Sequence, residues 1–325
     1  MRAVICRELT GVGGLEYVDN WPEPQAGPGE VLVDVKAAAL NFPDLLMIQG
    51  LYQERPPLPF VVGTEMAGVV AAVGEGVGHV AVGDRVVAAC GRALAERVAV
   101  KAPLVIPAPR ALDFTAASGI CITYFTTMYA LKQRAQLQAG ETLLVLGAAG
   151  GVGTTAVELG KQMGATVIAA ASSDAKLDLT RRLGADHVVN YATQDLRERI
   201  KEITGGKGVD VVYDPVGGSL AEPALRSMAW RGRYLVIGFA EGSIPALPWN
   251  LPLLKGASIV GVFWGEFVKR EPAAHAAGLK QLAQWYAQGL VKPVIDQRLP
   301  MSELKAAYER MGSRQAMVKL LLVNP

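Results

Sequence analysis

The sequence predicts a two-domain α/β protein, in which a β-rich first third is followed by a doubly wound parallel sheet. Three observations support this fold class. Prolines and short alternating runs fill the first part of the chain. From about residue 142 onward, helical segments alternate with short apolar strands. The length of 325 residues is enough for two domains, and apolar residues at 51% can supply a sizeable core.

The N-terminal third is expected to contain strands rather than long helices. Residues 30–37 alternate apolar and polar side chains, which is typical of a half-buried strand. Residues 61–73 are dense in Val, Ala and Gly, and residues 82–87 indicate a turn that enters a strand. The prolines between these runs disfavour helices. After about residue 112 the pattern changes, and residues 113–131 predict a helix.

The middle of the chain predicts a parallel sheet of six strands. Leu143 to Leu146 form a continuous apolar run, as expected for a strand that is covered on both faces. The expected strands are 143–146, 166–171, 187–190, 209–213, 233–237 and 258–262. The expected helices between them are 154–163, 176–183 and 196–203. The tail predicts helices near 279–286 and 301–311 and a last strand over 318–322.

A glycine-rich turn joins the first of these strands to its helix. It reads Gly-Ala-Ala-Gly-Gly-Val-Gly over residues 147–153, so Gly150 and Gly153 occupy the last two positions of a G-x-G-x-x-G pattern, and Ala148 replaces the first. Glycine permits a tight turn and a close approach to a pyrophosphate, which the free N–H groups of a helix N-terminus attract. The turn therefore predicts a dinucleotide site. The alternative is a tight turn without a ligand.

The end of the second strand distinguishes between the two nicotinamide cofactors. An NAD site usually has Asp or Glu there, whereas this strand ends at Ala171 and Ser172. Asp174 lies beyond the position at which an NAD site has its acidic residue, and it is interpreted as a helix cap. The Ser172 hydroxyl and the Lys176 ammonium suit a 2′-phosphate, and Tyr191, after the third strand, completes the expected pocket. We therefore predict NADPH. The alternative for Lys176 is a solvated helix residue.

Composition excludes several other classes of protein. The net charge of +2, without a basic run, does not indicate a nucleic-acid partner. The stretch of roughly 18 apolar residues that a membrane span needs is absent, and so is a secretory signal. Cys6, Cys90 and Cys121 are far apart and odd in number, which argues against a disulfide framework and favours a reducing cytoplasm. The three histidines are scattered without partners at ligand spacing, so no metal site is expected.

Two further motifs resemble a known superfamily. The stretch Gly63-Thr64-Glu65-Met66-Ala67-Gly68 is followed by Gly83-Asp84-Arg85-Val86. Together they are similar to the G-H-E-x-x-G and G-D-R-V stretches of the medium-chain dehydrogenase/reductase superfamily. Thr64 stands where the zinc-binding His would be, and Asn41-Phe42-Pro43-Asp44 occupies the region of the first zinc Cys. This combination resembles the zinc-independent quinone oxidoreductase (zeta-crystallin-like) branch.

The resemblance implies a domain organisation and a set of cofactor contacts. It implies a GroES-like catalytic domain over residues 1–122, a Rossmann NADPH-binding domain over 123–264 and a return to the catalytic domain over 265–325. It places Asn41, Asp44 and Thr126 near the nicotinamide and its ribose. The other implied contacts are Gly150, Gly151 and Val152 at the pyrophosphate, Ser172, Lys176 and Tyr191 at the 2′-phosphate, Gly238, Phe239, Phe263, Trp264 and Gly265 over the nicotinamide, and Lys319 from the last strand. The alternative for the aromatic segment 263–267 is core packing.

The expected reaction is hydride transfer from NADPH to a quinone without zinc. Without a Lewis acid, a substrate that needs less activation is favoured, and this can be a quinone or an enone, 2-alkenal or enoyl double bond. Tyr52 is a candidate pocket hydroxyl, with packing under the proline-rich loop as the alternative. A hypothesis of another class is a non-catalytic NADPH-binding redox sensor or crystallin-like protein. The resemblance also implies a homodimer that pairs through the strand at 258–262.

Overall fold

The computed structural model describes residues 1–313 and 319–323. The chain divides into two compact units. Unit 1 comprises Met1–Ile122 and the chain from Lys292 onward, and unit 2 comprises Thr123–Val291. The expected boundary after residue 122 coincides with this division, whereas the chain returns to unit 1 at Lys292 and not at residue 265. The helices that follow residue 264 pack within unit 2, because aromatic side chains on α9 (Trp264–Arg270) and α10 (Pro272–Ala287) contact α3 (Thr123–Met128) and the π-helix that follows it.

Unit 2 contains a six-stranded sheet in which every pair of neighbouring strands is parallel. The strand order is β11-β10-β9-β12-β13-β14, so the order reverses between β9 and β12. The strands are β9 (Thr142–Val145), β10 (Thr166–Ala171), β11 (His187–Asn190), β12 (Val209–Asp214), β13 (Met228–Val236) and β14 (Ser258–Gly261). The predicted six-stranded doubly wound sheet is confirmed.

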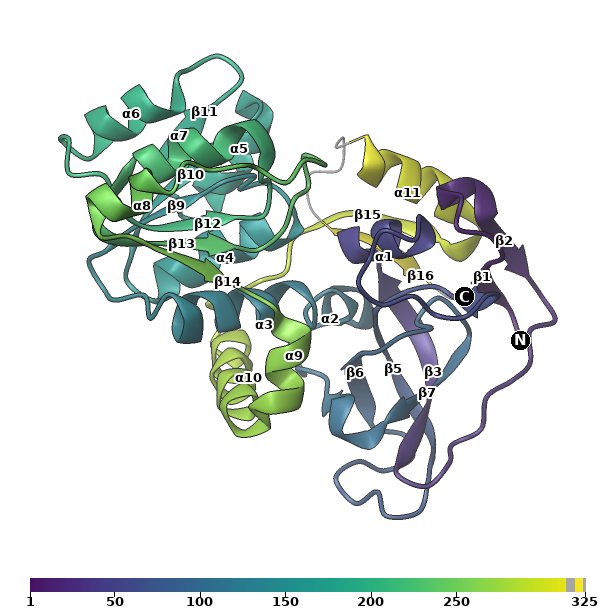
Figure 1. Ribbon diagram of the computed structural model, residues 1–325. Helices are drawn as coiled ribbons and strands as arrows, with labels where there is room; N and C mark the ends of the chain where they lie inside the picture. Colours follow the sequence, from purple (N-terminus) through teal and green to yellow (C-terminus); the bar gives the residue numbers. More distant parts are fainter. Residues whose placement is uncertain (314–318, 324–325) are drawn as a thin grey trace. The chain divides into compact units, whose positions relative to one another are not determined.

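Helices cover both faces of this sheet (Figure 1). The helices that cross between strands are α4 (Gly151–Gln162), α5 (Asp174–Arg182), α6 (Leu196–Ile203), α7 (Ala221–Arg226) and α8 (Asn250–Lys255). Side chains of α6, α7 and α8 share one buried cluster with the strands. The opposite face is covered by α4, as right-handed crossovers require. The central strands are buried on both sides, which explains their continuous apolar runs.

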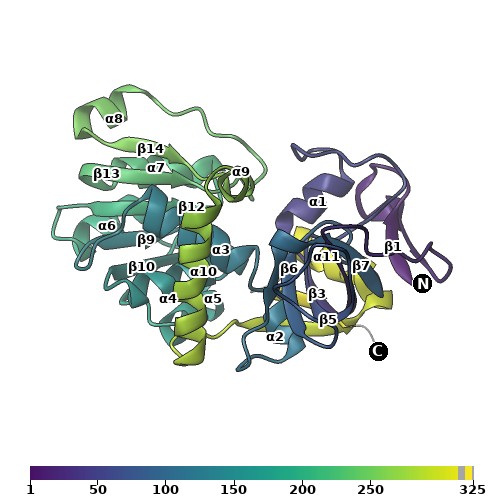
Figure 2. The ribbon, with the colours of Figure 1, turned by 90° about the horizontal axis from the view of Figure 1, so that it is seen from below.

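Unit 1 is built on strands that pair antiparallel, except for the parallel pair at the C-terminal end of the chain, with a few short helices (Figure 2). Its seven-stranded sheet runs β15-β16-β3-β5-β6-β8, with β7 paired to β3, and a second sheet runs β2-β1-β4. The strands are β1 (Ala3–Cys6), β2 (Leu15–Val18), β3 (Glu30–Ala39), β4 (Phe60–Val61), β5 (Glu65–Val73), β6 (Arg85–Ala89), β7 (Arg97–Lys101), β8 (Val105–Pro107), β15 (Ile295–Pro300) and β16 (Lys319–Val323). The helices are α1 (Phe42–Ile48), α2 (Phe114–Ser118) and α11 (Leu304–Gly312). One apolar core joins the large sheet to α1 and α11.

The single helix predicted over residues 113–131 is wrong. The structure has two shorter helices, α2 and α3, and the π-helix Tyr129–Arg134. Between α2 and α3 the chain leaves the helical path near Gly119, and the N–H of Ile122 donates to Glu65 instead of an intrahelical carbonyl. A distant buried acceptor therefore interrupts a locally helical sequence. The predicted strand 318–322 corresponds to β16, and Val318 lies outside the described residues.

Among the residues that the structure describes, no helix is long and apolar enough to span a membrane. The three cysteines are free thiols.

Candidate functional site

The predicted cofactor residues of unit 2 follow the carboxyl ends of its parallel strands. The glycine turn follows β9, Ser172 follows β10 and Tyr191 follows β11. Gly238 follows β13, and Phe263 follows β14. Because all six strands run in the same direction, these segments lie along one edge of the sheet. Open α/β sheets bind ligands at this edge, where the strand order reverses.

The glycine turn forms the N-terminus of α4, which begins at Gly151 with Gly150 as its N-cap. The first bond of the helix runs from the Thr154 N–H to the Gly150 carbonyl, at 2.9 Å. The N–H groups of Gly151, Val152 and Gly153 precede this bond and have no intrahelical partner. A Cβ on Gly153 would lie 2.2 Å from the Gly147 carbonyl oxygen, so only glycine fits the close contact between turn and helix. These N–H groups and the helix dipole can hold a phosphate group.

Ser172 and Lys176 lie together at the end of β10. The Lys176 ammonium donates to the Ser172 hydroxyl at 3.3 Å, and both side chains are partly exposed. The backbone of Tyr191 lies beside the end of β10, because its N–H donates to the carbonyl of Ala171 at 3.1 Å. The residue that caps α5 is Ser173, whose hydroxyl accepts from the Lys176 N–H, so the interpretation of Asp174 as the cap is wrong. The amide of Asn190 donates to Asp174 instead.

The ends of β12 and β13 are joined by a buried carboxyl group that the sequence did not reveal. Asp214 accepts from the N–H groups of Val216 and Gly217 through one oxygen and from the Tyr234 hydroxyl, at 2.6 Å, through the other. Burial raises the pKa of Asp214, although these three hydrogen bonds act to lower it. Asp214 thereby fixes the turn after β12 beside Phe239, whose ring lies 2.7 Å from where a Cβ of Gly217 would stand.

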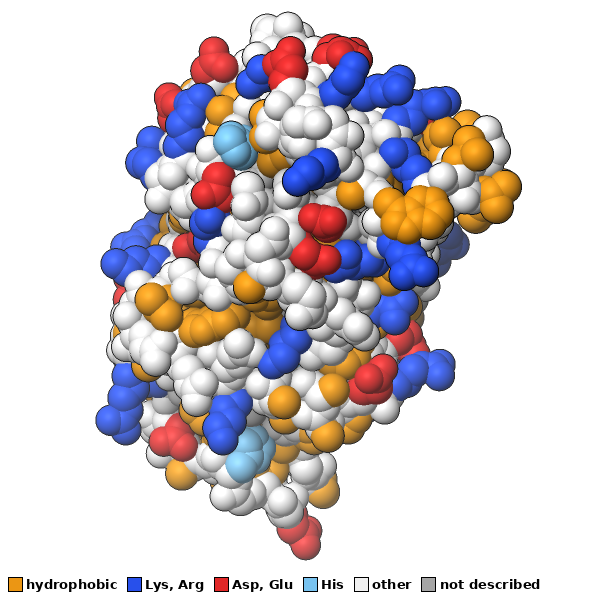
Figure 3. Space-filling view, turned by 90° about the vertical axis from the view of Figure 1, so that its left-hand side faces the viewer, with side chains coloured by type: hydrophobic (Ala, Val, Ile, Leu, Met, Phe, Trp, Pro, Cys, Tyr) orange, Lys and Arg blue, Asp and Glu red, His pale blue; other side chains and the backbone are white. Residues whose placement is uncertain are grey.

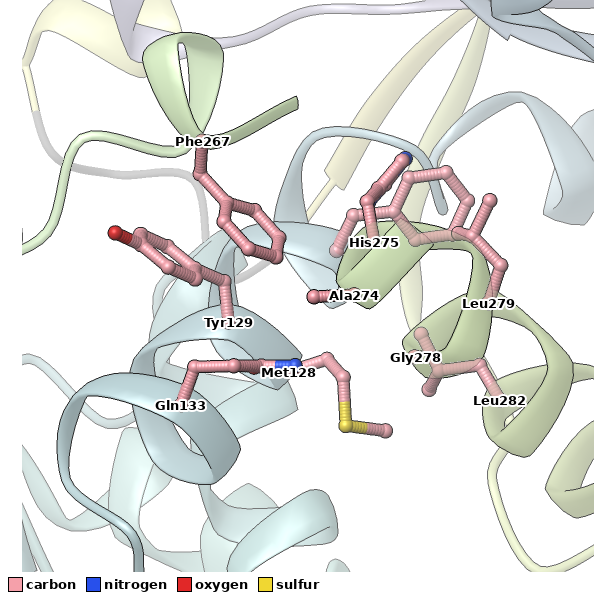
Figure 4. A pocket seen from close by; sticks show the side chains of 10 residues that line it. Met128, Tyr129, Gln133, Phe267, Ala274, His275, Gly278, Leu279 and Leu282 are labelled. Carbon is pink, nitrogen blue, oxygen red and sulfur yellow. The ribbon is translucent and has the colours of Figure 1, made fainter. Parts of the chain in front are cut away.

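The aromatic side chains of residues 263–267 differ in their exposure to solvent. Phe263 is 50% exposed, whereas Phe267 is buried and stacks on Tyr129 with ring centroids 4.0 Å apart. Figure 4 shows this pair beside His275 on α10, in a small pocket that also contains Met128. Burial lowers the pKa of His275. Phe267 is therefore a packing residue, and Phe263, Trp264 and Gly265 remain the predicted cofactor contacts of this segment.

In unit 1, Asn41 belongs to a buried polar network. Its Nδ2 donates to Glu65 Oε1 at 2.8 Å and to Thr64 Oγ1 at 3.2 Å, and its Oδ1 accepts from the Lys319 ammonium. Lys319 also donates to Glu65 Oε1 at 2.5 Å and to the Leu40 carbonyl at 3.4 Å. Asn41 and Lys319 are 5% and 7% exposed, so these polar groups are directed into unit 1. The predicted contacts of Asn41 and Lys319 with the cofactor stay predictions.

Asp44 adjoins this network through the backbone of Asn41 and is fully buried. Its Oδ2 accepts from the Asn41 N–H at 2.8 Å, which makes Asp44 part of the capping box of α1. Burial raises the pKa of Asp44 to about 7, while the Asn41 N–H, the nearby Thr64 hydroxyl and the Lys319 ammonium oppose this rise. Asp44 therefore acts as a buried support of the helix end in this structure, and its predicted cofactor contact is untested.

Two other predicted residues are partly exposed. Thr126 lies on α3, and Tyr52 lies in the loop between α1 and β4.

Glu65, which is 0% exposed and joins Asn41, Lys319 and the Ile122 N–H, was not predicted as a functional residue. The signal that could have identified Glu65 is the presence of an acidic residue inside a segment dense in Val, Ala and Gly.

Comparisons with known proteins agree with this architecture. Residues 27–126 match the alcohol dehydrogenase GroES-like domain, and residues 151–280 match the zinc-binding dehydrogenase domain. The chain is 36% identical over 323 residues to quinone oxidoreductase-like protein 2 of Rattus norvegicus, covering 99% of this chain and 91% of the relative.

Solved structures extend the comparison. The Escherichia coli quinone oxidoreductase complexed with NADPH is 30% identical, with a TM-score of 0.91 over 100% of both chains. The CurK enoyl reductase is 27% identical, with a TM-score of 0.90 over 100% of this chain and 99% of that one. The sequence motifs, the two domain types and these relatives agree: the chain belongs to the quinone oxidoreductase group of the medium-chain dehydrogenase/reductase superfamily.

Proposed function

We propose that the protein is an NADPH-dependent oxidoreductase that reduces quinones by hydride transfer. The observation that carries the cofactor assignment is the pairing of Ser172 and Lys176 at the end of β10, next to the glycine turn. An ammonium and a hydroxyl there suit a 2′-phosphate, and the N-terminus of α4 suits the pyrophosphate. Bound NADPH would supply the hydride. The relative complexed with NADPH supports this assignment.

The cofactor assignment has a direct test. The substitution Lys176→Ala removes the ammonium that faces Ser172, and we expect KM for NADPH to rise about 10- to 100-fold while KM for NADH changes little. Steady-state kinetics with both cofactors measure this difference. Lys207→Ala, at an exposed position on the loop before β12, is the matched control. A wild-type preference for NADH would contradict the assignment.

We also propose that the reaction proceeds without zinc, on the basis of the side chains around Thr64. The Lys319 ammonium already pairs with Glu65, and it would repel a divalent cation. Burial raises the pKa of the Cys90 thiol to about 12 and that of Cys121 well above its usual value, which disfavours the thiolate forms that bind zinc. Metal analysis of the purified protein tests this proposal, and stoichiometric zinc together with loss of activity on chelation would refute it.

The substrate class is tested by following the loss of NADPH absorbance with p-benzoquinone and with 2-cyclohexenone as acceptors. We expect faster turnover with the quinone, since the relatives named for quinone reduction support that substrate. The similarity to an enoyl reductase supports the second candidate, reduction of a double bond conjugated to a carbonyl, and faster turnover with the enone would favour it. Tight NADPH binding without turnover of either acceptor would favour a redox sensor.

We propose a homodimer that pairs through β14, which is the edge strand of the unit 2 sheet. Large apolar side chains are exposed on and near α8 and β13, and they form an apolar patch of Trp230, Ile244, Trp249, Leu253 and Leu254. Figure 3 shows hydrophobic side chains gathered in a projecting group at the right-hand edge of the face that it displays. An edge strand flanked by exposed apolar side chains favours pairing with a second copy.

A further inference from the structure

Two turns of unit 2, the β12 turn (residues 215–217) and the β13 turn (residues 237–241), are joined along their backbones. The N–H of Ala240 donates to the carbonyl of Pro215 at 3.0 Å, and the N–H of Glu241 donates to the carbonyl of Val216 at 2.9 Å. These bonds continue the parallel pairing of β12 with β13 beyond the ends of both strands. The two turns therefore form one hydrogen-bonded layer at the carboxyl edge of the sheet.

The β12 turn also contacts the glycine turn that follows β9. A Cβ on Gly147 would lie 2.8 Å from Cγ2 of Val216 and 3.8 Å from Cγ of Pro215. Because the strand order reverses between β9 and β12, this contact lies where an open α/β sheet binds its ligand. The β12 turn is thus placed between the glycine turn and the β13 turn.

The carboxyl group of Asp214 holds the β12 turn in place. Its Oδ1 accepts from the N–H groups of Val216, at 2.8 Å, and Gly217, at 2.9 Å. Its Oδ2 accepts at 2.6 Å from the hydroxyl of Tyr234, which extends from β13. Asp214 is 3% exposed, so a single buried side chain joins the turn that follows its own strand to the neighbouring strand.

The predicted 2′-phosphate site determines which half of the cofactor these two turns would receive. Ser172 and Lys176 follow β10, which lies on one side of the strand-order reversal, whereas β12 and β13 lie on the other side. The 2′-phosphate belongs to the adenosine half of NADPH. With the pyrophosphate at the glycine turn, the nicotinamide half extends over the β12 and β13 turns.

We infer that Asp214 is a positioning residue of the NADPH site, whose carboxyl group holds the β12 and β13 turns in the arrangement that receives the nicotinamide half of the cofactor. This inference rests on the proposed function and deepens it. Both oxygens of Asp214 are bonded within the protein, so the residue acts through the backbone of Val216 and Gly217 and through Tyr234. Binding of the nicotinamide half should depend on Asp214, and binding of the adenosine half should not.

Two ligands separate the two halves of the cofactor. NADPH contains both, whereas 2′,5′-ADP carries the adenosine and its 2′-phosphate but no nicotinamide. In Asp214→Ala we expect the dissociation constant of NADPH to rise about 10-fold in a fluorescence titration, because the released N–H groups let the β12 turn change its conformation. The dissociation constant of 2′,5′-ADP, measured by calorimetry, should stay within about twofold of the wild-type value.

Two further variants show whether the hydrogen bonds of this one carboxyl group are responsible. Asp214→Asn keeps an oxygen for the two backbone N–H groups, and its amide nitrogen can donate to the Tyr234 oxygen, so we expect it to restore most of the NADPH affinity. Asp210→Ala is the matched control. Asp210 lies near the amino end of the same strand, where its carboxyl group accepts from the Thr142 N–H at 2.8 Å. Its loss should leave both dissociation constants unchanged.

Asp214→Leu combined with Tyr234→Phe keeps the test decisive if Asp214→Ala does not fold. Apolar groups then replace both partners of the buried bond, so the Tyr234 hydroxyl is not left unpaired. We expect the same selective loss of NADPH affinity. Wild-type NADPH affinity in the folded variants, or an equal loss of affinity for both ligands, would overturn the inference. If the wild type binds neither ligand, the proposed function fails, whereas a wild type that binds both, with unaffected variants, defeats this inference alone.

Discussion

Asp44 shows how the position of one side chain creates a pH dependence. The carboxyl group is fully buried, and its Oδ1 has no hydrogen-bond partner among the described residues. Its pKa of about 7 in the folded protein is above its usual value of 3.8. The folded state therefore binds this proton more tightly than the unfolded state does, so the protein loses stability as the pH rises from about 4 to 7.

The substitution Asp44→Asn tests this linkage. We expect the free energy of unfolding of the wild type to fall between pH 5 and pH 7 by an amount that Asp44→Asn does not show, with an upper limit of roughly 2.7 kcal/mol. Denaturant unfolding at several pH values measures the difference. Asp178→Asn, at an exposed ion pair on α5, is the control and should follow the wild type. Parallel curves for the wild type and Asp44→Asn would contradict the prediction.

At the scale of elements, the glycine turn joins β9 to α4 through close backbone contacts. Gly147 has a φ of +57°, a conformation that favours glycine, and the N–H of Gly150 closes the turn onto the carbonyl of Gly147 at 2.9 Å. The close contact at Gly153 then brings the helix start against the turn. The geometry of the N–H groups at the predicted pyrophosphate site thus depends on a residue that carries no side chain.

Gly153→Ala should damage both the fold of this turn and the binding of the cofactor. The added methyl group would meet the Gly147 carbonyl oxygen at 2.2 Å, so the helix must shift. We expect a loss of about 3 kcal/mol in the free energy of unfolding and weaker binding of NADPH, measured by denaturation and by fluorescence titration. Gly78→Ala, where an added Cβ has open space, is the control. Unchanged NADPH affinity in Gly153→Ala would contradict the assignment of this turn to the pyrophosphate.

At the scale of the whole molecule, the proposed homodimer is supported by the open edge at β14 and by the apolar patch on and near α8. Leu253 is 77% exposed, and a charge at this position would face solvent in a monomer but an apolar surface in the dimer. We therefore expect Leu253→Glu to give a monomer in sedimentation analysis, while the wild type is a dimer. Val82→Glu, at a 65% exposed position in unit 1, should leave the dimer intact. A monomeric wild type would refute the proposed homodimer.

The residue pattern alone was sufficient to predict the six parallel strands, the glycine turn and the family, because each of these depends on local periodicity or on short motifs. It also predicted that Ser172, Lys176 and Tyr191 follow neighbouring strands, since strand order and direction place consecutive strand ends at one edge. These features require no knowledge of distant contacts.

The tertiary structure decided what depends on distant contacts. The helix predicted over residues 113–131 is broken where the Ile122 N–H reaches Glu65, and β15 is formed by a segment without clear alternation that pairs with β16. The network of Asn41, Thr64, Glu65 and Lys319 joins positions up to 278 residues apart, so no local pattern reveals it. Burial is the physical reason for its importance: a charge or amide removed from water must find its partners inside the fold, and these partners determine which way each donor points.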